Sequence, residues 1–600
     1  MTETPSPPRA ARRWLWLLLA FWAAACVWLL WRDWAAVRAM QFPDSDDDMR
    51  LLQVRDWLGG QSWFDLHQYR LQPPSGADIH WTRLVDLPLA AVNLLLRPLL
   101  GAAAAEHVAA VAIPLVTLLC AMALLAAIVR RCVAPEAWWW APALLLMASP
   151  ALGMMVPLRI DHHGWQIACL LAMVWGLIDP ARRRGGLVAG FSLAASLTIG
   201  VEMLPYCALG LAAAALAWVQ DAAERERLRW MAGSIILAAT LALYLFIPPA
   251  ARFGAHCDAL SSAYLLPLQL GGAALLVITL LPAAGVGRRL GLAIGAGAIA
   301  AVPLLGATGL CLADPYHAVD PEARRLWLGI VAEALPLFRQ TIDVALATLM
   351  LPLVGLAGAA LMLRRTRGDA AATRAWLLLA VLSLASIALS LAQTRSAVTA
   401  QAMAVPGAAA LGWLGLRRLR ASESPLIRVF GSVGLFLAVS ALLPHLLIAL
   451  TLAPPSDPRE EADAKASIGC GAPAAFAALD VLPAGTMLAG LDATPALVTH
   501  SHHQGLAGPY HRNGAAIVAT MRAWTGSPED ALAIVRHYRI RYVALCGAPS
   551  EGDFYRKRGP HGFYATLADG RAPGWLEPAP VAGTPWHVWR VTDRALLPAG

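Results

Sequence analysis

The chain has 600 residues, of which 58% are hydrophobic and only 14% are charged, and its formal net charge is +8. A soluble protein of this length could not hide so much apolar surface in cores of ordinary size, so repeated apolar runs of about 20 residues indicate a membrane protein. Arginine-rich segments between the apolar runs account for the positive charge, and we expect no nucleic-acid partner.

The apolar runs predict a polytopic α-helical protein with about thirteen transmembrane helices. The first run, residues 14–31, is rich in tryptophan and is followed by "WRDWAAVRAMQF" in place of a small-residue cleavage site. We therefore expect a retained anchor and not a cleaved signal peptide. The other expected spans are 106–129, 137–156, 163–178, 186–201, 204–219, 229–249, 263–283, 290–312, 342–363, 375–392, 401–416 and 428–452.

Arginine runs decide the orientation of these spans. The segments "PPRAARR", "DPARRR", "DAAERERLR", "RRTRGDAAATR" and "LRRLRASESPLIR" all fall on one side, which the positive-inside rule identifies as the cytoplasm. The N-terminus is then cytoplasmic, and a long first loop, about 32–105, lies outside. Its stretch "RLVDLPLAAVNLLLRPLLG" suits a helix at the membrane interface. We expect a multi-pass protein of the bacterial inner membrane whose C-terminal region is periplasmic.

The composition changes after residue 452. A linker rich in proline and charge, "APPSDPREEADAKASIGCGAP", leads to three short strand-like runs, "GTMLAGLD", "PALVTH" and "IRYVALCG". Between them "SPEDALAIVRHY" predicts a helix with Ser527 as its N-cap. We therefore expect a membrane domain at 1–452 and a small external α/β domain at 453–600. Cys470 and Cys546 can pair if that domain lies in an oxidising compartment.

Ionisable residues gather at the external ends of the spans, where their cost makes them candidates for function. The densest group is the acidic turn "FPDSDDDMRLLQ", which begins about ten residues after the first span. Each candidate also has a structural explanation, since an acidic run can cap a helix, a histidine pair can be structural and an arginine can reach lipid headgroups. The external candidates are Asp44, Asp46, Asp47, Asp48, Asp161, His162, His163, Glu202, Glu333 and Arg395.

This constellation resembles the GT-C glycosyltransferases, and most closely the catalytic subunit of oligosaccharyltransferases of the bacterial and archaeal type. That family has thirteen spans, an external C-terminal domain and an Asp shortly after the first span, a position that Asp46 or Asp47 holds here. Its other motifs match in the same order along the chain. The matching residues are Asp161 and His163 of "DHH", His80 of "PPSGADIHWTRL", Glu333 of "IVAE", and Arg395 ahead of Pro406.

One motif of that family is missing. Oligosaccharyltransferases carry Trp-Trp-Asp-Tyr-Gly in the external domain, where it reads the hydroxyl of the acceptor sequon. The corresponding region here, "LPAGTMLAGLDATPALVTH", keeps Asp492 but lacks the aromatic residues. It is followed by the loop "THSHHQGLAGPYHRN", which we expect to contact the acceptor or another part of the substrate. The residues expected to do so are His502, His503, Tyr510, His511 and Arg512.

The resemblance implies transfer of a sugar or oligosaccharide from a polyprenyl-phosphate or -pyrophosphate donor to a glycan, lipid or protein acceptor outside the cytoplasm. A divalent cation, Mg²⁺ or Mn²⁺, suits the carboxylate and imidazole ligands that the motifs supply. Arg395 is expected to bind the donor phosphate through its planar guanidinium. Asp46, Asp47 and Glu333 are expected to act in catalysis. The expected metal ligands are Asp46, Asp47, His80, Asp161 and His163.

The main alternative is a transporter or flippase of lipid-linked intermediates or other solutes. Transporters usually contain inverted repeats and polar residues at mid-membrane. The sequence shows no internal repeat, and its ionisable residues lie at one face, so the transferase is the preferred interpretation.

Overall fold

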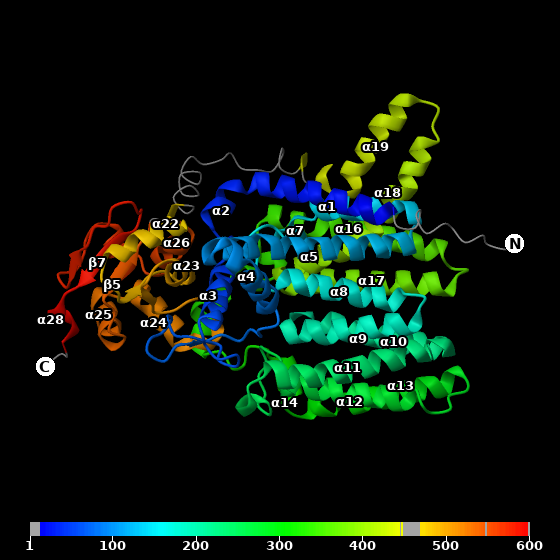
Figure 1. Ribbon diagram of the computed structural model, residues 1–600, viewed down its shortest axis with the longest axis horizontal. Helices are drawn as coiled ribbons and strands as arrows, with labels where there is room; N and C mark the ends of the chain where they lie inside the picture. Colours follow the sequence, from blue (N-terminus) through cyan, green and yellow to red (C-terminus); the bar gives the residue numbers. More distant parts are fainter. Residues whose placement is uncertain (1–12, 444–445, 448–468, 547–548, 598–600) are drawn as a thin grey trace.

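Long apolar helices lie side by side and form the larger part of the molecule (Figure 1). The computed structural model describes residues 13–443, 446–447, 469–546 and 549–597. Within these ranges, eight helical segments are long and apolar enough to span a membrane, which makes the chain a multi-pass membrane protein. They contain α1 (Arg13–Arg32), α5 (Ala102–Cys132), α10 (Leu204–Gln220), α11 (Arg225–Phe246), α13 (Val286–Ala301), α16 (Ile342–Arg365), α17 (Ala370–Ala392) and α18 (Ala397–Arg420).

The remaining predicted spans coincide with shorter or interrupted helices. The apolar helices α8 (His163–Ile178), α12 (Ser262–Ile278) and α19 (Pro425–Val439) have 15 to 17 residues. Helix α9 (Arg182–Ile199) begins with three arginines. The expected span 137–156 is divided into α6 (Trp140–Met147) and α7 (Ser149–Gly153), since Pro150 starts a new helix. The end of the expected span 428–452 lies outside the described residues.

Glycines allow two of the helix pairs to pack closely. A Cβ on Gly358 of α16 would collide with the Gly407 carbonyl of α18, and a Cβ on Gly355 would collide with Ala404. In the same way, Gly190 of α9 lies against Ser234 of α11. Small residues are the usual way for membrane helices to bring their backbones together, because lipid supplies no hydrophobic drive for association.

The long loop after α1, which we expect to be external, folds against the end of the helix bundle. It contains α2 (Trp34–Ala39), α3 (Ser45–Leu58), α4 (Asp86–Leu100) and a small antiparallel pair, β1 (His67–Gln68) with β2 (Ala77–Asp78). Helix α4 buries Leu89 and Ala90 but leaves Leu95 and Leu99 exposed. This amphipathic pattern is the one expected for a helix at the membrane interface.

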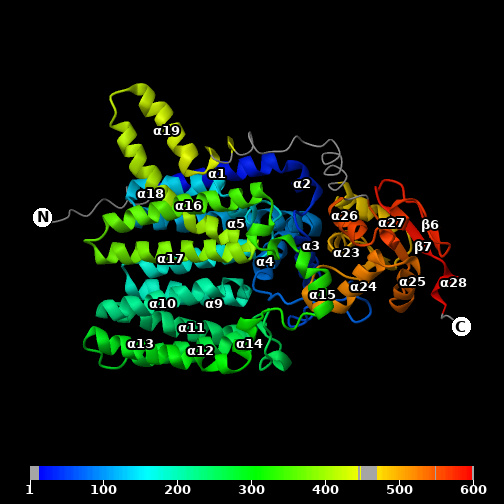
Figure 2. The same cartoon turned by 180° about the vertical axis from the view of Figure 1, so that it is seen from behind.

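The C-terminal part lies at the same end of the bundle as this loop, as the two opposite views agree (Figures 1 and 2). Its five-stranded sheet has the order β4-β3-β5-β7-β6, with β3 parallel to β4 and β5, and β7 antiparallel to β5 and β6. The strands are β3 (Thr486–Leu488), β4 (Gln504–Gly505), β5 (Tyr542–Leu545), β6 (Leu576–Pro578) and β7 (His587–Val591).

Helices cover this sheet, and three of the sequence predictions can be compared with them. Ser527 caps α25 (Pro528–His537) in a capping box with Asp530, as predicted. Cys470 and Cys546 form a disulfide, so the pairing that the sequence left open is made. The strand prediction for "PALVTH" is wrong, because this run is α23 (Thr494–His500). The other helices are α22 (Pro473–Ala477), α24 (Gly514–Thr525), α26 (Pro549–Arg558), α27 (Phe563–Ala568) and α28 (Asp593–Leu596).

The segment between α13 and α16 connects the bundle to the C-terminal part. It contains α14 (Ala307–Ala313) and α15 (Pro321–Leu326). Arg522 of α24 forms an ion pair with Glu322 of α15 at 2.5 Å. A second disulfide, Cys257–Cys311, joins the loop after α11 to α14 and was not predicted. The expected domain boundary at 452/453 falls among residues that are not described.

Candidate active site

The acidic turn after the first helix is held against the loop that precedes α8. Asp44 caps α3, and the three following aspartates occupy its first turn, where they favour the positive end of the helix dipole. Asp47 is fully buried. One of its oxygens accepts a hydrogen bond from Arg159 Nη1 at 2.7 Å, and the other accepts from the backbone N–H of Asp161 at 2.8 Å. The protein itself therefore occupies both oxygens of Asp47.

The two carboxylate oxygens of Asp161 differ in their surroundings. Its Oδ1 lies 2.6 Å from His162 Nδ1 and 3.3 Å from Arg50 Nη2. Its Oδ2 is buried and has no hydrogen-bond partner among the described residues. His163 Nε2 lies 3.5 Å from that oxygen. A buried carboxylate oxygen that faces an imidazole nitrogen and lacks a donor has the character of a cation ligand.

Asp46 lies near enough to Asp161 for the two carboxylates to repel each other. Its carboxylate accepts no hydrogen bond in the described part of the chain. Its pKa is raised well above its usual value, first by burial and then by the carboxylates of Asp161, Asp44 and Glu333. The pKa of Asp161 moves the other way, because His162 and His163 outweigh the effect of burial. The ligand atoms of Asp161, His162 and His163 lie within 4.8 Å of one another. Asp46 adds a second carboxylate nearby, and a divalent cation would relieve its repulsion with Asp161.

Buried arginines support this group, and the sequence analysis missed them. Arg50 lies 4.7 Å from the ring of Trp81 and donates to Asp86 Oδ1 at 2.7 Å as well as to Asp161. Arg50 and Arg159 both stand on the side that the positive-inside rule leaves poor in arginine, which is the signal that could have identified them. They are paired with the acidic residues that they position.

His162 extends the network toward α10. Its Nε2 lies 3.2 Å from Glu202 Oε1, and Gln166 Nε2 donates to the other oxygen of Glu202. Burial alone would lower the pKa of His162, but the carboxylates of Asp161 and Glu202 raise it to about 10. His162 is therefore a cationic bridge between the two acids, and its neighbour His163 keeps Nε2 directed at Asp161.

Arg395 and Glu333 lie together at the external end of α18. Their side chains approach to 3.6 Å, and Glu333 is 57% exposed while Arg395 is 22% exposed. Arg395 Nε has no hydrogen-bond partner among the described residues. The loop is fixed by Thr394, whose N–H donates to the Leu335 carbonyl at 2.9 Å. The arginine thus keeps donor capacity for a further anionic group.

The predicted loop of the C-terminal part divides into two groups. Tyr510 is buried beside the acidic turn, and its hydroxyl donates to the Ser45 carbonyl at 3.2 Å. By contrast, His503 Nε2 lies 3.0 Å from the Leu479 carbonyl, and His502 Nε2 lies 2.9 Å from the Leu482 carbonyl. These two histidines pack within the C-terminal part, away from the acidic turn. His500, at the start of the same loop, instead lies 2.8 Å from Asp48 Oδ1.

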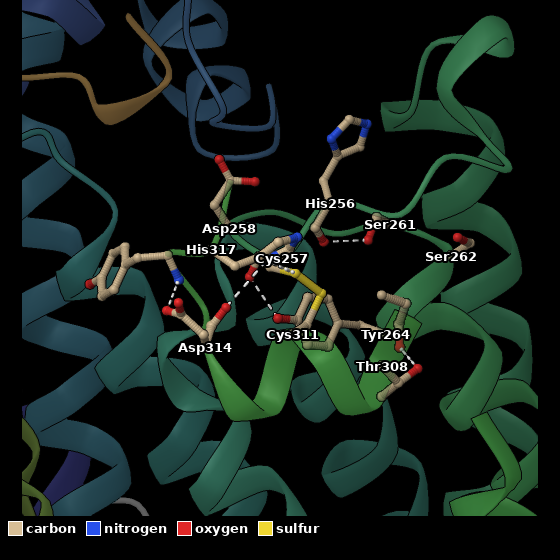
Figure 3. Close-up of a disulfide and its surroundings, with 12 residues drawn as sticks. His256, Cys257, Asp258, Ser261, Ser262, Tyr264, Thr308, Cys311, Asp314 and His317 are labelled. Atoms are coloured by element: carbon tan, nitrogen blue, oxygen red, sulfur yellow. Dashed lines mark hydrogen bonds between the residues drawn. A yellow bond between two sulfur atoms is a disulfide. The ribbon is translucent and has the colours of Figure 1, made fainter. Parts of the chain in front are cut away.

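His511 and Arg512 face the loop after α11. His511 Nε2 lies 2.8 Å from Asp258 Oδ2, and Arg512 makes two hydrogen bonds to the same carboxylate. His80, expected beside Asp161, lies with this group, its ring 4.6 Å from that of His511. Burial, and then His511, keep the pKa of His80 well below its usual value. Figure 3 shows Asp258 beside the Cys257–Cys311 disulfide.

No protein-family model and no curated protein matches this chain. Solved structures do match it. The archaeal oligosaccharyltransferase AglB from Archaeoglobus fulgidus, in complex with an inhibitory peptide and a dolichol-phosphate, aligns over 89% of this chain and 69% of its own with a TM-score of 0.61 and 14% identity.

Two other structures of the Archaeoglobus fulgidus oligosaccharyltransferase are similar. The one tethered to an acceptor peptide with the NVT sequon has a TM-score of 0.62 and 14% identity, over 98% of this chain and 75% of that one. The complex with Zn and sulfate has a TM-score of 0.57 and 14% identity, over 87% and 67%. The aligned regions include both the bundle and the C-terminal part, so this chain shares the overall fold of these oligosaccharyltransferase structures.

Proposed function

We propose that the protein is a membrane glycosyltransferase of the GT-C type, which transfers a sugar or oligosaccharide from a polyprenyl-phosphate or -pyrophosphate donor to an acceptor outside the cytoplasm. The observation that carries the proposal is the buried Oδ2 of Asp161, which has no hydrogen-bond partner among the described residues and lies 3.5 Å from His163 Nε2 within an oligosaccharyltransferase-like fold. A transporter needs no such group at one face of the membrane.

Asp46, Asp161 and His163 are the residues that would hold a divalent cation, Mg²⁺ or Mn²⁺. Two carboxylates and one imidazole suit these ions, and the pKa of Asp46 is raised first by burial and then by the neighbouring carboxylates, against the opposing effect of Arg159. When bound, the cation would stabilise negative charge on the departing phosphate oxygen. Asp47 is proposed to support these residues and not to bind the cation, because its oxygens already accept hydrogen bonds from Arg159 and from the Asp161 N–H.

Arg395 would bind the donor phosphate. Its Nε is buried without a partner, and a planar guanidinium matches two phosphate oxygens at once. Glu333 keeps the guanidinium in place at 3.6 Å and is itself exposed, so it can accept a proton or a hydrogen bond from the acceptor. Tyr510 closes the acidic turn from the side of the C-terminal part.

The acceptor is expected to differ from a sequon peptide. Gly490 and Leu491 precede Asp492, and Ala493 follows it, so no aromatic N–H or hydroxyl stands where the Trp-Trp-Asp-Tyr-Gly motif would supply one. Glu551 fixes this turn by accepting hydrogen bonds from the Leu491 and Asp492 N–H groups. A glycan, a lipid or a protein hydroxyl is the proposed acceptor. An Asn-x-Thr peptide that is glycosylated efficiently by the purified protein would contradict this.

The protein is proposed to lie in a bacterial inner membrane, with its N-terminus cytoplasmic and its C-terminal part periplasmic. The two disulfides support this orientation. Cys257–Cys311 and Cys470–Cys546 lie on the side assigned to the periplasm, where an oxidising environment maintains such bonds.

The test uses the full-length protein in lipid nanodiscs and lipid-linked sugars extracted from its native cells. We expect the wild type with Mn²⁺ or Mg²⁺ to consume the donor and release polyprenyl phosphate, and chelation or Asp161→Asn to stop this. Asp480→Asn is the matched control, since Asp480 lies beside His502, outside the proposed site, and is exposed. A wild type that consumes no donor with either cation, or that transports the donor intact, would overturn the proposal.

A further inference from the structure

We propose that His80, Asp258 and His511 form a second divalent-cation site, separate from the Asp46–Asp161–His163 group, with a preference for Zn²⁺ or a metal of similar character. The site lies where three parts of the chain meet: the first external loop, the loop after α11 and the C-terminal part. It does not depend on the proposed transfer reaction.

The three side chains already lie at nearly the spacing that one cation requires. One ligand atom from each residue lies within 4.8 Å of the others. His511 Nε2 and Asp258 Oδ2 are 2.8 Å apart, and the two imidazole rings are 4.6 Å apart at 53° to one another. Ligand atoms around a tetrahedral Zn²⁺ are roughly 3.3–3.6 Å apart, so side-chain rotation and shifts of about 1 Å would complete the coordination.

The ring nitrogens of His80 are available for a metal ion. Within the described part of the chain its ring nitrogens form no hydrogen bond, although the ring is half-buried between Trp81 and His511. A buried imidazole normally uses at least one nitrogen in a hydrogen bond. A nitrogen that lacks one and faces a carboxylate and a second imidazole is available as a ligand.

The charges around the site favour a cation despite the nearby arginine. Arg512 donates to Asp78 at 2.9 Å as well as to Asp258. Two carboxylates therefore surround one guanidinium, which leaves a net negative charge when the two histidines are neutral. The oxygens of Asp258 retain lone pairs beyond those used by Arg512, and a carboxylate can hold an arginine on one edge and a metal on the other.

The Cys257–Cys311 disulfide fixes the position of Asp258. It anchors the adjoining residue to α14, and Figure 3 shows the Asp258 carboxylate pointing away from the disulfide toward the ribbon of the first loop. Tyr264 reinforces this loop, because its hydroxyl donates to the Cys257 carbonyl at 2.6 Å. A ligand that is held in place before the metal arrives costs less conformational entropy on binding.

The donor set separates this site from the first one. Two imidazoles with one carboxylate match the common three-residue zinc sets, in which a water or another group takes the fourth position. The first group has two carboxylates and one imidazole, a harder set that suits Mg²⁺ or Mn²⁺. The two sites are thus expected to differ in metal preference and to load independently.

The test measures bound zinc in the full-length protein after chelation, re-equilibration with ZnCl₂ and dialysis, by inductively coupled plasma mass spectrometry. His80→Gln is the decisive variant, because it removes one ligand but keeps the Asp258–Arg512 ion pair that holds the loops together. We expect it to bind one fewer Zn²⁺ per chain than the wild type, and His511→Gln to do the same.

Two backgrounds make the result specific. In Asp161→Asn, which disables the first group, His80→Gln should still remove a zinc, whereas His502→Gln should remove none from either background. Co²⁺ titration of Asp161→Asn should give the visible absorbance of a low-symmetry site, lost on adding His80→Gln. Unchanged zinc in His80→Gln and His511→Gln, or complete loss of zinc in Asp161→Asn alone, would overturn the second site while leaving the proposed transferase untouched.

Discussion

The backbone N–H of Asp161 donates to Asp47 Oδ1 at 2.8 Å, across 114 residues of sequence. Through this bond and the Arg159 ion pair, the acidic turn after the first helix sets the position of the loop before α8. Neighbouring aspartates consequently have different tasks. Asp47 accepts structural hydrogen bonds with both oxygens, whereas the Asp46 carboxylate accepts none among the described residues and lies near Asp161.

Asp46→Asn and Asp47→Asn should therefore fail in different ways. Asp46→Asn should reduce donor turnover by about 10²–10³-fold with an unchanged melting temperature, since it removes a proposed cation ligand that accepts no hydrogen bond among the described residues. Asp47→Asn should lower the free energy of unfolding by about 3–5 kcal/mol, because it leaves Arg159 buried without its nearest partner. Turnover and thermal unfolding in nanodiscs, measured on both variants, separate the two. Equal stability of the pair would refute the division of roles.

Arg395 is expected to determine donor affinity. Arg395→Lys keeps the charge but loses the planar pair of donors, and Arg395→Ala loses both. We expect the KM for the lipid-linked donor to rise in that order, by about 10–100-fold for alanine, which corresponds to one or two charge-assisted hydrogen bonds. Arg339→Ala, in the same external loop as Glu333, is the control. If Arg395→Ala keeps the wild-type KM, the arginine is a structural partner of Glu333.

Arg50 should act through Asp161 as a positioning residue. Its guanidinium holds Asp161 Oδ1 and leaves Oδ2 free for a cation. We expect Arg50→Lys to weaken the activating Mn²⁺ by about 10–100-fold while saturating Mn²⁺ restores much of the rate. Arg55→Lys on the same helix, which pairs with Glu106, should leave the Mn²⁺ requirement unchanged. A loss of rate in Arg50→Lys that no Mn²⁺ concentration restores would argue for a purely structural role.

Alkylation should separate the free cysteines from the disulfide-bonded cysteines, which lie in segments assigned to the periplasm. The described free cysteines, Cys26, Cys120, Cys132, Cys169 and Cys207, should be trapped by a thiol reagent after unfolding without reductant, whereas the four disulfide cysteines should react only after reduction. Peptide mass spectrometry of protein from native membranes reads this directly. Reduced Cys257 and Cys311 in native membranes would contradict the periplasmic assignment of their loops.

The sequence was sufficient wherever the signal was local. Apolar runs located the helices, and the adjacency of Asp161 and His163 at the start of a span placed both in one group. The pairs that depend on tertiary contacts carried no such signal. His511 and Asp258 are 253 residues apart, so nothing in the sequence directs His80 toward them and away from Asp161. The short apolar run "PALVTH" has the composition of a strand but forms α23, which packs against α3, and the sequence holds no sign of that distant contact.

The contacts between the two ends of the chain also bear on how the protein is made. Asp48 and His500 are 452 residues apart, and Ser45 and Tyr510 are 465 apart. The acidic turn leaves the ribosome almost first, but the side chains that cover it are translated almost last. An unfinished chain that is already inserted in the membrane thus lacks His500 and Tyr510, which contact the acidic turn in the complete protein. The order of synthesis would therefore leave the proposed site incomplete until translation is nearly finished.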